Sequence, residues 1–290
     1  MEKFINFISG RTFSSDYFVD SLLANLLGLQ VFRFIAGRTL YNIKYFFYKD
    51  KPFALQKNGY MVFENFLSEN EFLLLKKEFE LAIKDENFSQ KYIGYGVGVD
   101  AVHVCLDEKI KNKYPNLYKF SKNKKILSLF SSNALKKKLD MVVKIEKLEA
   151  KKEGDEGDAS KLWHYDIYYN TFKAWLYLDD VGIEQGPLHY VAASHGFSLE
   201  RLLAEWKSSI QYSLRTDKKF PKPWSYPAYE AGSKKYDHYN RISKKCTGKK
   251  NTVLFGNTAA LHRRGDAIPG RQRNTIHFYV RESPFKILFG

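Results

Sequence analysis

The second half of this 290-residue sequence is divided into short segments that are bounded by turn-forming residues. The segments are rich in Val, Ile, Tyr, Phe and Trp, which are the residue types that strands favour. We predict strands at residues 141–148, 163–169, 172–178, 188–191, 251–255 and 275–280. Many short strands with few helices between them favour a mainly β fold of sandwich or barrel type over alternating βαβ units.

The first half of the sequence predicts helices. Apolar residues recur at helical spacing over residues 17–38, and the aromatic residues 41–48 are compatible with helix or strand. After a short predicted strand at residues 60–63, Ser68 is placed to cap a helix over residues 69–84. We therefore expect an N-terminal helical segment over residues 1–54, followed by one β domain with flanking helices over residues 55–290.

Residues 196–250 interrupt the series of predicted strands. This segment contains a predicted helix near residues 199–207 and then a stretch rich in Pro, Tyr and Lys. Long insertions in compact domains often act as lids or binding loops, so we expect a lid-like insertion here.

The charge of the chain is strongly positive and uneven. The formal net charge is +15, and residues 196–290 hold 19 Lys and Arg against 7 Asp and Glu. A basic surface favours an anionic substrate, anionic lipid headgroups or nucleic acid, with a solvated lysine-rich face as the alternative. The sequence has no RNP-type motif, helix-turn-helix pattern or zinc finger, so nucleic acid is not the partner we expect.

Cysteine content and the N-terminal pattern bear on location. The two cysteines, Cys105 and Cys246, exclude a multi-bridge disulfide framework and fit a reducing, cytoplasmic compartment. Residues 1–11 lack the features of a signal peptide. Residues 18–37 are apolar but repeatedly interrupted by polar residues, which favours a packed amphipathic helix over a membrane span. Peripheral contact of this helix with a membrane is the alternative.

A histidine and an aspartate stand two residues apart in the predicted strand at residues 163–169. Side chains at positions i and i+2 of a strand point to the same side, so His164 and Asp166 could bind one metal ion together. A third ligand would come from elsewhere in the chain, and His262 and His277 are candidates. Two histidines and one carboxylate form the face that holds ferrous iron in oxygenases and leaves positions open for O₂ and a cosubstrate.

The residues around this pair carry a family resemblance. The motifs, in chain order, are WHYD at 163–166, AWLYLDDV at 174–181, GPLHYVAASH at 186–195, and LF at 254–255 before His262, with Arg271 and Arg273 following. In this order they resemble the phytanoyl-CoA dioxygenase family of iron(II)- and 2-oxoglutarate-dependent oxygenases. The resemblance covers the chain in outline from about residue 55 to residue 280.

The resemblance implies a double-stranded β-helix of jelly-roll, cupin-like type that binds Fe(II). It assigns the metal ligands to His164, Asp166 and His262, since His262 precedes the arginines as the family pattern has it. His277 lies within an apolar predicted strand and is expected to be a core or pocket histidine.

The same resemblance implies residues that bind the cosubstrate 2-oxoglutarate. An arginine shortly after the distal histidine should bind its far carboxylate, because a guanidinium matches a carboxylate through two parallel hydrogen bonds. Arg273 is our choice and Arg271 the reserve. Trp175 matches a position near the cosubstrate pocket of relatives, and a packed core aromatic is the alternative.

These features predict an oxidoreductase, a metal-binding dioxygenase that hydroxylates a small or lipid-linked substrate with O₂. Asp166 is retained where related halogenases have a small residue, which disfavours halogenation. We expect an anionic substrate because the insertion carries Lys218, Lys219, Lys222, Lys234, Lys235, Arg241, Lys244 and Lys245. The alternatives are a catalytically silent basic protein that binds membranes or nucleic acid, and a demethylase that uses the same chemistry.

Overall fold

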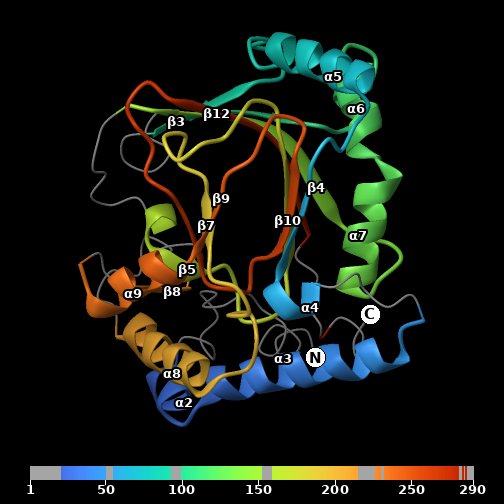
Figure 1. Cartoon of the computed structure of the whole chain (residues 1–290). Helices are drawn as coiled ribbons and strands as arrows, with labels where there is room; N and C mark the ends of the chain where they lie inside the picture. The colour runs from blue at the N-terminus through green and yellow to red at the C-terminus, as the bar shows by residue number, and fades with distance from the viewer. Residues whose placement is uncertain are drawn as a thin grey trace.

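The computed structural model describes residues 21–49, 55–92, 99–151, 159–214, 226–229, 232–280, 283 and 285. Within these residues, the strands form two antiparallel sheets with helices around them (Figure 1). The larger sheet has the order β1-β10-β6-β12-β4-β3-β2 and the smaller one β8-β5-β11-β7-β9. The mainly β, jelly-roll prediction is confirmed, with two sheets that do not close on each other among the residues described.

The elements have the following bounds. The strands of the larger sheet are β1 (Tyr60–Phe63), β2 (Gln90–Tyr92), β3 (Val99–Cys105), β4 (Met141–Ala150), β6 (Phe172–Tyr177), β10 (Val253–Asn257) and β12 (Gln272–Val280). Those of the smaller sheet are β5 (Trp163–Tyr165), β7 (Leu188–Tyr190), β8 (Tyr226–Tyr229), β9 (Lys244–Cys246) and β11 (His262–Arg264). The helices are α2 (Leu22–Leu26), α3 (Leu29–Phe47), α4 (Leu55–Asn58), α5 (Glu69–Ala82), α6 (Pro115–Ser121), α7 (Lys124–Ala134), α8 (Leu199–Ser213) and α9 (Lys234–Ile242), with short 3₁₀ turns at Glu108–Ile110 and Ala159–Lys161.

One face of the larger sheet packs against helices α5, α6 and α7, which lie along one side of the molecule (Figure 1). Strand alternation directs every second side chain of β6, β10 and β12 into this core. Phe130 of α7 meets Phe255 of β10 edge-on, with ring centroids 4.9 Å apart. Fully burying one such phenyl ring contributes about 1.5–3 kcal/mol. The predicted Ser68 cap is confirmed, since its side chain accepts from the Glu71 N–H in a capping box.

The other face of the larger sheet is turned to the smaller sheet and carries polar side chains. Lys173 and Trp175 alternate with the core residues of β6, and Arg273 and His277 do so on β12. The structure therefore separates an apolar core on the helix side from a polar interior between the sheets. The metal-site residues predicted from the sequence belong to this interior.

The N-terminal helical segment runs along one end of the jelly roll. The predicted helix at residues 17–38 is in fact two helices, α2 and α3, which meet at Gly28 with a φ of +91°. Residues 17–20 lie outside those described. The ambiguous aromatic stretch at residues 41–48 is mostly helical, because α3 continues to Phe47. No helix among the described residues is long and apolar enough to cross a membrane.

The insertion at residues 196–250 is partly built into the fold. Helix α8 contacts α2 and α3, β8 pairs with β5, and β9 pairs with β7 at the edges of the smaller sheet. Residues 215–225, including Lys218, Lys219 and Lys222, lie outside those described. The lid-like role of this insertion stays a prediction.

One strand is shorter than expected. The predicted strand at residues 163–169 ends at Tyr165, so His164 and Asp166 do not share a strand. The chain leaves the smaller sheet at Asp166, whose backbone N–H donates to the Thr258 carbonyl at 3.0 Å. This turn, rather than strand alternation, sets the direction of the carboxylate.

Candidate metal and cosubstrate site

Strand pairing in the smaller sheet brings the two histidines of the site together. His262 begins β11 and lies directly opposite His164 of β5 in the antiparallel register. Both side chains are buried, and their ring centroids are 4.4 Å apart. Residues separated by nearly one hundred positions thus meet because β5 and β11 are neighbours.

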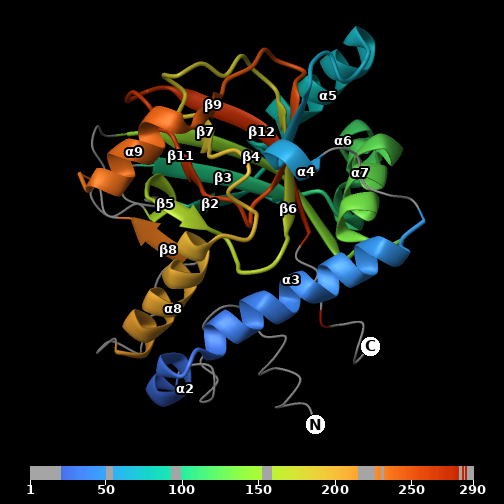
Figure 2. The same cartoon turned by 60° about the horizontal axis from the view of Figure 1, so that its bottom comes forward.

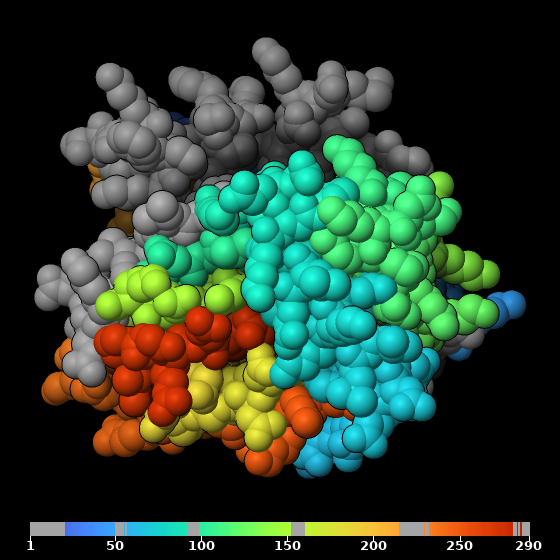
Figure 3. Space-filling model, turned by 90° about the horizontal axis from the view of Figure 1, so that it is seen from above, coloured from blue at the N-terminus to red at the C-terminus, as the bar shows by residue number. Residues whose placement is uncertain are grey.

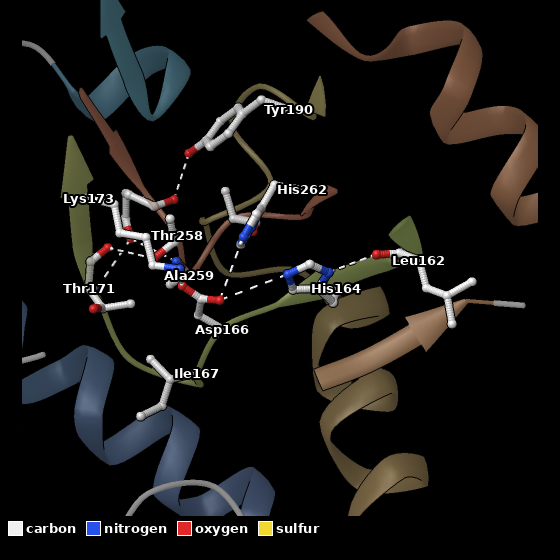
Figure 4. Close-up of polar contacts among 12 residues, drawn as sticks. Leu162, His164, Asp166, Ile167, Thr171, Lys173, Tyr190, Thr258, Ala259 and His262 are labelled. Atoms are coloured by element: carbon white, nitrogen blue, oxygen red, sulfur yellow. Dashed lines mark hydrogen bonds and ion pairs between the residues drawn. The ribbon is translucent and has the colours of Figure 1, made fainter. Parts of the chain in front are cut away.

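Asp166 faces both histidines from the turn that follows β5 (Figure 4). Its Oδ1 lies 3.9 Å from His164 Nε2 and 3.7 Å from His262 Nε2. One ligand atom from each of the three residues lies within 4.8 Å of the others. These distances exceed hydrogen-bond length but suit atoms that share one ion, because metal–ligand bonds of about 2.0–2.2 Å place ligands on either side of the ion.

The histidine rings are held in the tautomer that metal binding requires. Nδ1 of His164 lies 2.7 Å from the Leu162 carbonyl, and Nδ1 of His262 lies 2.8 Å from the Ala260 carbonyl. A carbonyl only accepts, so each Nδ1 carries the proton and each Nε2 lone pair faces Asp166. Burial lowers the pKa of His164, and burial with the neighbouring His164 lowers the pKa of His262 to about 3. Both rings are therefore neutral and able to bind a cation.

Lys173 supports the carboxylate from the opposite sheet. Its Nζ lies 2.5 Å from Asp166 Oδ2, the oxygen turned away from the histidines. This ion pair leaves Oδ1 directed at the two imidazoles (Figure 4). Lys173 was missed in the sequence, although a lysine between the core residues Phe172 and Ala174 is a signal that it faces the interior.

The two predicted cosubstrate arginines have different surroundings. Arg273 points into the interior, where burial lowers the pKa of its guanidinium and Nη1 donates to the Gly186 carbonyl. Gly186 itself has a φ of +63°, and a Cβ added there would lie 2.7 Å from the Gly265 carbonyl oxygen. Arg271 is half-exposed and forms an ion pair with Glu184 at 2.7 Å. Of the two, Arg273 is therefore the interior guanidinium.

A basic pocket lies between the start of β12 and the end of β11. Its cationic lining consists of Lys161, Arg264, Arg271 and Arg273. The apolar side is formed by residues of β3 and β4, among them Leu148. Because Arg264 follows His262 by two positions on β11, both side chains point to the same side of the smaller sheet. The pocket and the ligand cluster therefore share the strand β11, through Arg264 and His262.

Figure 3 views the end of the molecule where the segment leading into β12, in red, meets the loop before β7, in yellow. These two segments carry Arg271 and Gln185, which line the basic pocket. The pocket therefore belongs to this end of the jelly roll. The α3 helix lies at the other end (Figure 1).

Trp175 and His277 form a stacked pair on the interior face of β6 and β12. They are register partners, with ring centroids 5.2 Å apart and an angle of 12° between the planes. His277 is buried, neither ring nitrogen has a hydrogen-bond partner, and burial lowers its pKa well below the ordinary value. The expectation that His277 is a core or pocket histidine fits this position, and it is not part of the ligand cluster.

A further polar group on the interior face was missed in the sequence. Glu146 of β4 lies 2.9 Å from His103 Nε2 and 3.0 Å from Lys144 Nζ. Burial alone raises the pKa of Glu146, but the hydrogen bond from His103 and the positive charge of Lys144 bring it well below the ordinary value. The carboxylate is therefore ionised and balances part of the positive charge between the sheets.

Comparison with known proteins agrees with this geometry. The family model for phytanoyl-CoA dioxygenase matches residues 55–235, which is more than half of the chain. An epimerase, SnoN, in complex with Fe³⁺, alpha ketoglutarate and nogalamycin RO is 16% identical with a TM-score of 0.50, covering 86% of this chain and 84% of its own. EctD from S. alaskensis, in its apoform, is 14% identical with a TM-score of 0.51, and 82% of each chain is covered. No curated protein was found to match in sequence.

The fold is thus the one shared by iron- and 2-oxoglutarate-dependent oxygenases. The chain belongs to the phytanoyl-CoA dioxygenase family, which confirms the resemblance seen in its motifs. It is an oxygenase of the iron- and 2-oxoglutarate-dependent class.

Proposed function

We propose that this chain is an Fe(II)- and 2-oxoglutarate-dependent hydroxylase whose iron ligands are His164, Asp166 and His262. The observation that carries the proposal is the convergence of two neutral Nε2 atoms and one carboxylate oxygen within 4.8 Å. Two imidazoles and one carboxylate suit ferrous iron and leave coordination positions for exogenous ligands. Bound iron would supply the activation of O₂, while the protein fixes the ligands and the pocket.

Arg273 is proposed to anchor the far carboxylate of 2-oxoglutarate. Its half-buried guanidinium faces the interior, and it lines the basic pocket. Arg271, the reserve candidate, is drawn outward by Glu184. Trp175 is proposed to bound the cosubstrate space together with the His277 ring on which it stacks. In this arrangement the guanidinium provides orientation and charge, and the stacked rings exclude water.

The proposed reaction is hydroxylation of a C–H bond. One atom of O₂ enters succinate as 2-oxoglutarate loses CO₂, and the other enters the C–H bond of the substrate. Asp166 supports this outcome over halogenation, because its carboxylate occupies the position that a halide would need. Lys173 would hold this carboxylate in place throughout.

An anionic small or lipid-linked substrate is proposed. Besides Arg273, the basic pocket carries three cationic side chains, Lys161, Arg264 and Arg271, with Glu184 and Asp266 as the acidic partners of two of them. Within the insertion, Lys235 is paired with Glu200 at 2.6 Å, so it is a weaker candidate. The pocket thus supports the expectation of an anionic substrate better than the described lysines of the insertion do.

The free thiols Cys105 and Cys246 fit a reducing, cytoplasmic setting.

Turnover in the presence of Fe(II), 2-oxoglutarate and a panel of anionic compounds tests the proposal. We expect succinate formation coupled to the gain of one oxygen atom by an acidic compound, with turnover that weakens as salt increases. Lys161→Gln should raise the KM for that compound, whereas Lys235→Gln, a charge-matched control outside the pocket, should not. Succinate without an oxygenated product would reject hydroxylation, and no succinate at all would favour a silent binding protein.

A further inference from the structure

Helix α3 has its polarity inverted relative to an ordinary surface helix. On the side that packs against the jelly roll it buries Gln30 and Arg33, at 1% and 0% exposure, beside one large apolar residue, Phe34. On its outward side it exposes Phe32, Phe46 and Phe47, the last two at 74% and 75%. A helix that rests on a protein core and faces water shows the opposite pattern.

The two helices beside α3 have the same inversion. In α8 the buried residues are Arg201, Glu205 and Ser209, and α2 buries Asn25. The large apolar residues that these two helices expose are Leu23, Leu26, Leu199 and Leu203. Single exposed apolar residues are normal on protein surfaces, but three adjacent helices with polar residues inside and apolar residues outside are not.

Buried polar side chains of α3 and α8 are hydrogen-bonded to one another, which stabilises the inverted arrangement. Gln30 donates to Glu205 at 2.9 Å, and Glu205 also accepts from Arg201 at 2.7 Å. Arg33 donates to Gln30 at 3.0 Å and to the Tyr168 hydroxyl at 3.3 Å. Buried charges that are paired and hydrogen-bonded in this way are tolerated. These buried hydrogen bonds therefore fix the rotation of α3 and α8 about their axes.

The exposed apolar side chains lie on three helices that are neighbours in space. Helices α2, α3 and α8 contact one another, and all three lie at the same end of the molecule (Figures 1 and 2). We call this surface the apolar face and define it as Leu23, Leu26, Leu27, Phe32, Ile35, Ile43, Phe46, Phe47, Leu199 and Leu203. Clusters of exposed apolar residues of this kind mark sites of contact with another apolar phase.

The charge around the apolar face indicates what covers it. Residues 21–49 contain four basic and no acidic side chains. Lys49 and Lys207 are exposed beside the face, and Lys44 is half-exposed. Trp206 of α8, whose Nε1 donates to the Leu26 carbonyl, adds the aromatic type that prefers the boundary between lipid and water. The carboxylate of Glu200, which is 47% exposed next to Leu199, is paired with Lys235 at 2.6 Å. Apolar side chains flanked by lysines complement an anionic lipid surface.

We propose that the apolar face is a docking surface for an anionic lipid bilayer, on which the protein rests as a peripheral enzyme. The α3 helix has 19 residues and would lie along the membrane, with its outward phenyl rings among the headgroups and upper acyl chains. This proposal does not depend on the reaction proposed above.

Docking in this way gives the jelly roll a defined orientation. Phe34 of α3 packs in one cluster with Ile167, Tyr168 and Tyr169, which directly follow the proposed ligand Asp166. The basic pocket lies at the opposite end of the molecule, at the start of β12 (Figures 1 and 3). A docked molecule therefore turns the basic pocket toward water, where it can receive a soluble anion or an extended polar headgroup.

Co-sedimentation of the full chain with lipid vesicles tests the proposal. We expect binding to vesicles made of equal parts phosphatidylcholine and phosphatidylglycerol, and much weaker binding to phosphatidylcholine alone. The double variant Phe46→Ser/Phe47→Ser should reduce partitioning by about tenfold or more, because two phenyl rings no longer enter the lipid. The matched control is Leu73→Ser/Leu81→Ser, which removes two exposed apolar residues from α5 and should bind like the parent.

The other occupants of the face give different results. If the parent does not bind vesicles but self-associates, and Phe46→Ser/Phe47→Ser abolishes the association, the face is an interface between copies and the proposal is wrong. If vesicles bind only after deletion of residues 2–20, that segment covers the face and the proposal is also wrong. Equal loss of vesicle binding in both double variants would overturn it as well. Melting curves of all variants should match the parent, since every substituted side chain is exposed.

Discussion

Glu205 is the carboxylate at the centre of the buried polar cluster between α3 and α8, and its replacement by glutamine tests how that cluster is held. Glu205 is fully buried and Arg201 is 1% exposed. The two groups are joined by Arg201 Nε and Nη2, each 2.7 Å from Glu205 Oε1. Arg201 also donates to the carbonyls of Ala259 and Ile167, at 2.8 and 3.2 Å. The pair therefore ties α8 to the loops that carry the proposed iron ligands.

Glu205→Gln keeps the volume of the side chain but removes its charge. The guanidinium of Arg201 stays buried without its counter-ion. The new amide N–H₂ also replaces one carboxylate oxygen and must face either the Gln30 amide or the Arg201 guanidinium, both of which donate. Removing one partner of a buried ion pair costs about 3–5 kcal/mol. For a chain of this size we expect a fall in Tm of about 6–10 °C, using about 2 °C per kcal/mol.

Urea and thermal unfolding of the parent, Glu205→Gln and a matched control measure this effect. The control is Glu200→Gln on the same helix, where the carboxylate is 47% exposed and pairs with Lys235. An exposed pair contributes about 0–1 kcal/mol, so this variant should unfold almost like the parent. If Glu205→Gln cost less than about 1 kcal/mol, the cluster would not behave as a buried ion pair.

Three further predictions concern the cosubstrate anchor, the thiols and the core. Arg273→Ala should raise the KM for 2-oxoglutarate by about 100-fold or more, because a charged hydrogen-bond partner is lost. Arg271→Ala should raise it by less than about threefold, because Arg271 is held outward by Glu184. Equal effects of the two substitutions in steady-state assays would reject the assignment. Iodoacetamide at neutral pH should modify the exposed Cys105 and spare Cys246, because burial raises the pKa of the Cys246 thiol to about 12. Comparable modification of both cysteines in peptide mass spectrometry would contradict this prediction. Phe255→Ala should lower the free energy of unfolding by about 3–5 kcal/mol in urea titrations, because it leaves a cavity beside Phe130. A loss below about 1 kcal/mol would show instead that neighbouring side chains fill the space left by the phenyl ring.

The sequence predicted those helices and strands that are marked by a capping residue or by apolar spacing within a few neighbouring residues. The Ser68 cap and the α5 helix, the strand β1 and most of the strands that build the interior were of this kind. The exit of the chain from β5 at Asp166 was not, because it depends on a hydrogen bond to the distant Thr258. The break at Gly28 has a local cause, a glycine in the left-handed region, which the helical apolar spacing on both sides of it concealed. The strand β3 and the helices α6 and α7 were not predicted, since their apolar residues face a core that the whole fold defines.

The three candidate ligands could be named from the sequence, whereas the residues that support them could not. His164, Asp166 and His262 could be chosen from motif order, and the structure brings all three together. The pairing of Lys173 with Asp166 depends on how two sheets face each other, which no local pattern reveals. The same limit applies to Glu146 with His103, whose partners come from neighbouring strands.

Anaerobic titration with Fe(II) and 2-oxoglutarate tests the central claim most directly. The parent should develop the visible charge-transfer band of 2-oxoglutarate chelated to iron. His164→Ala should abolish the band by removing an iron ligand, and Arg273→Ala should shift its appearance to higher 2-oxoglutarate concentrations. His238→Ala, which replaces an exposed histidine of α9 outside the ligand cluster, should still form the band. An unchanged band in both His164→Ala and Arg273→Ala would contradict the proposed site.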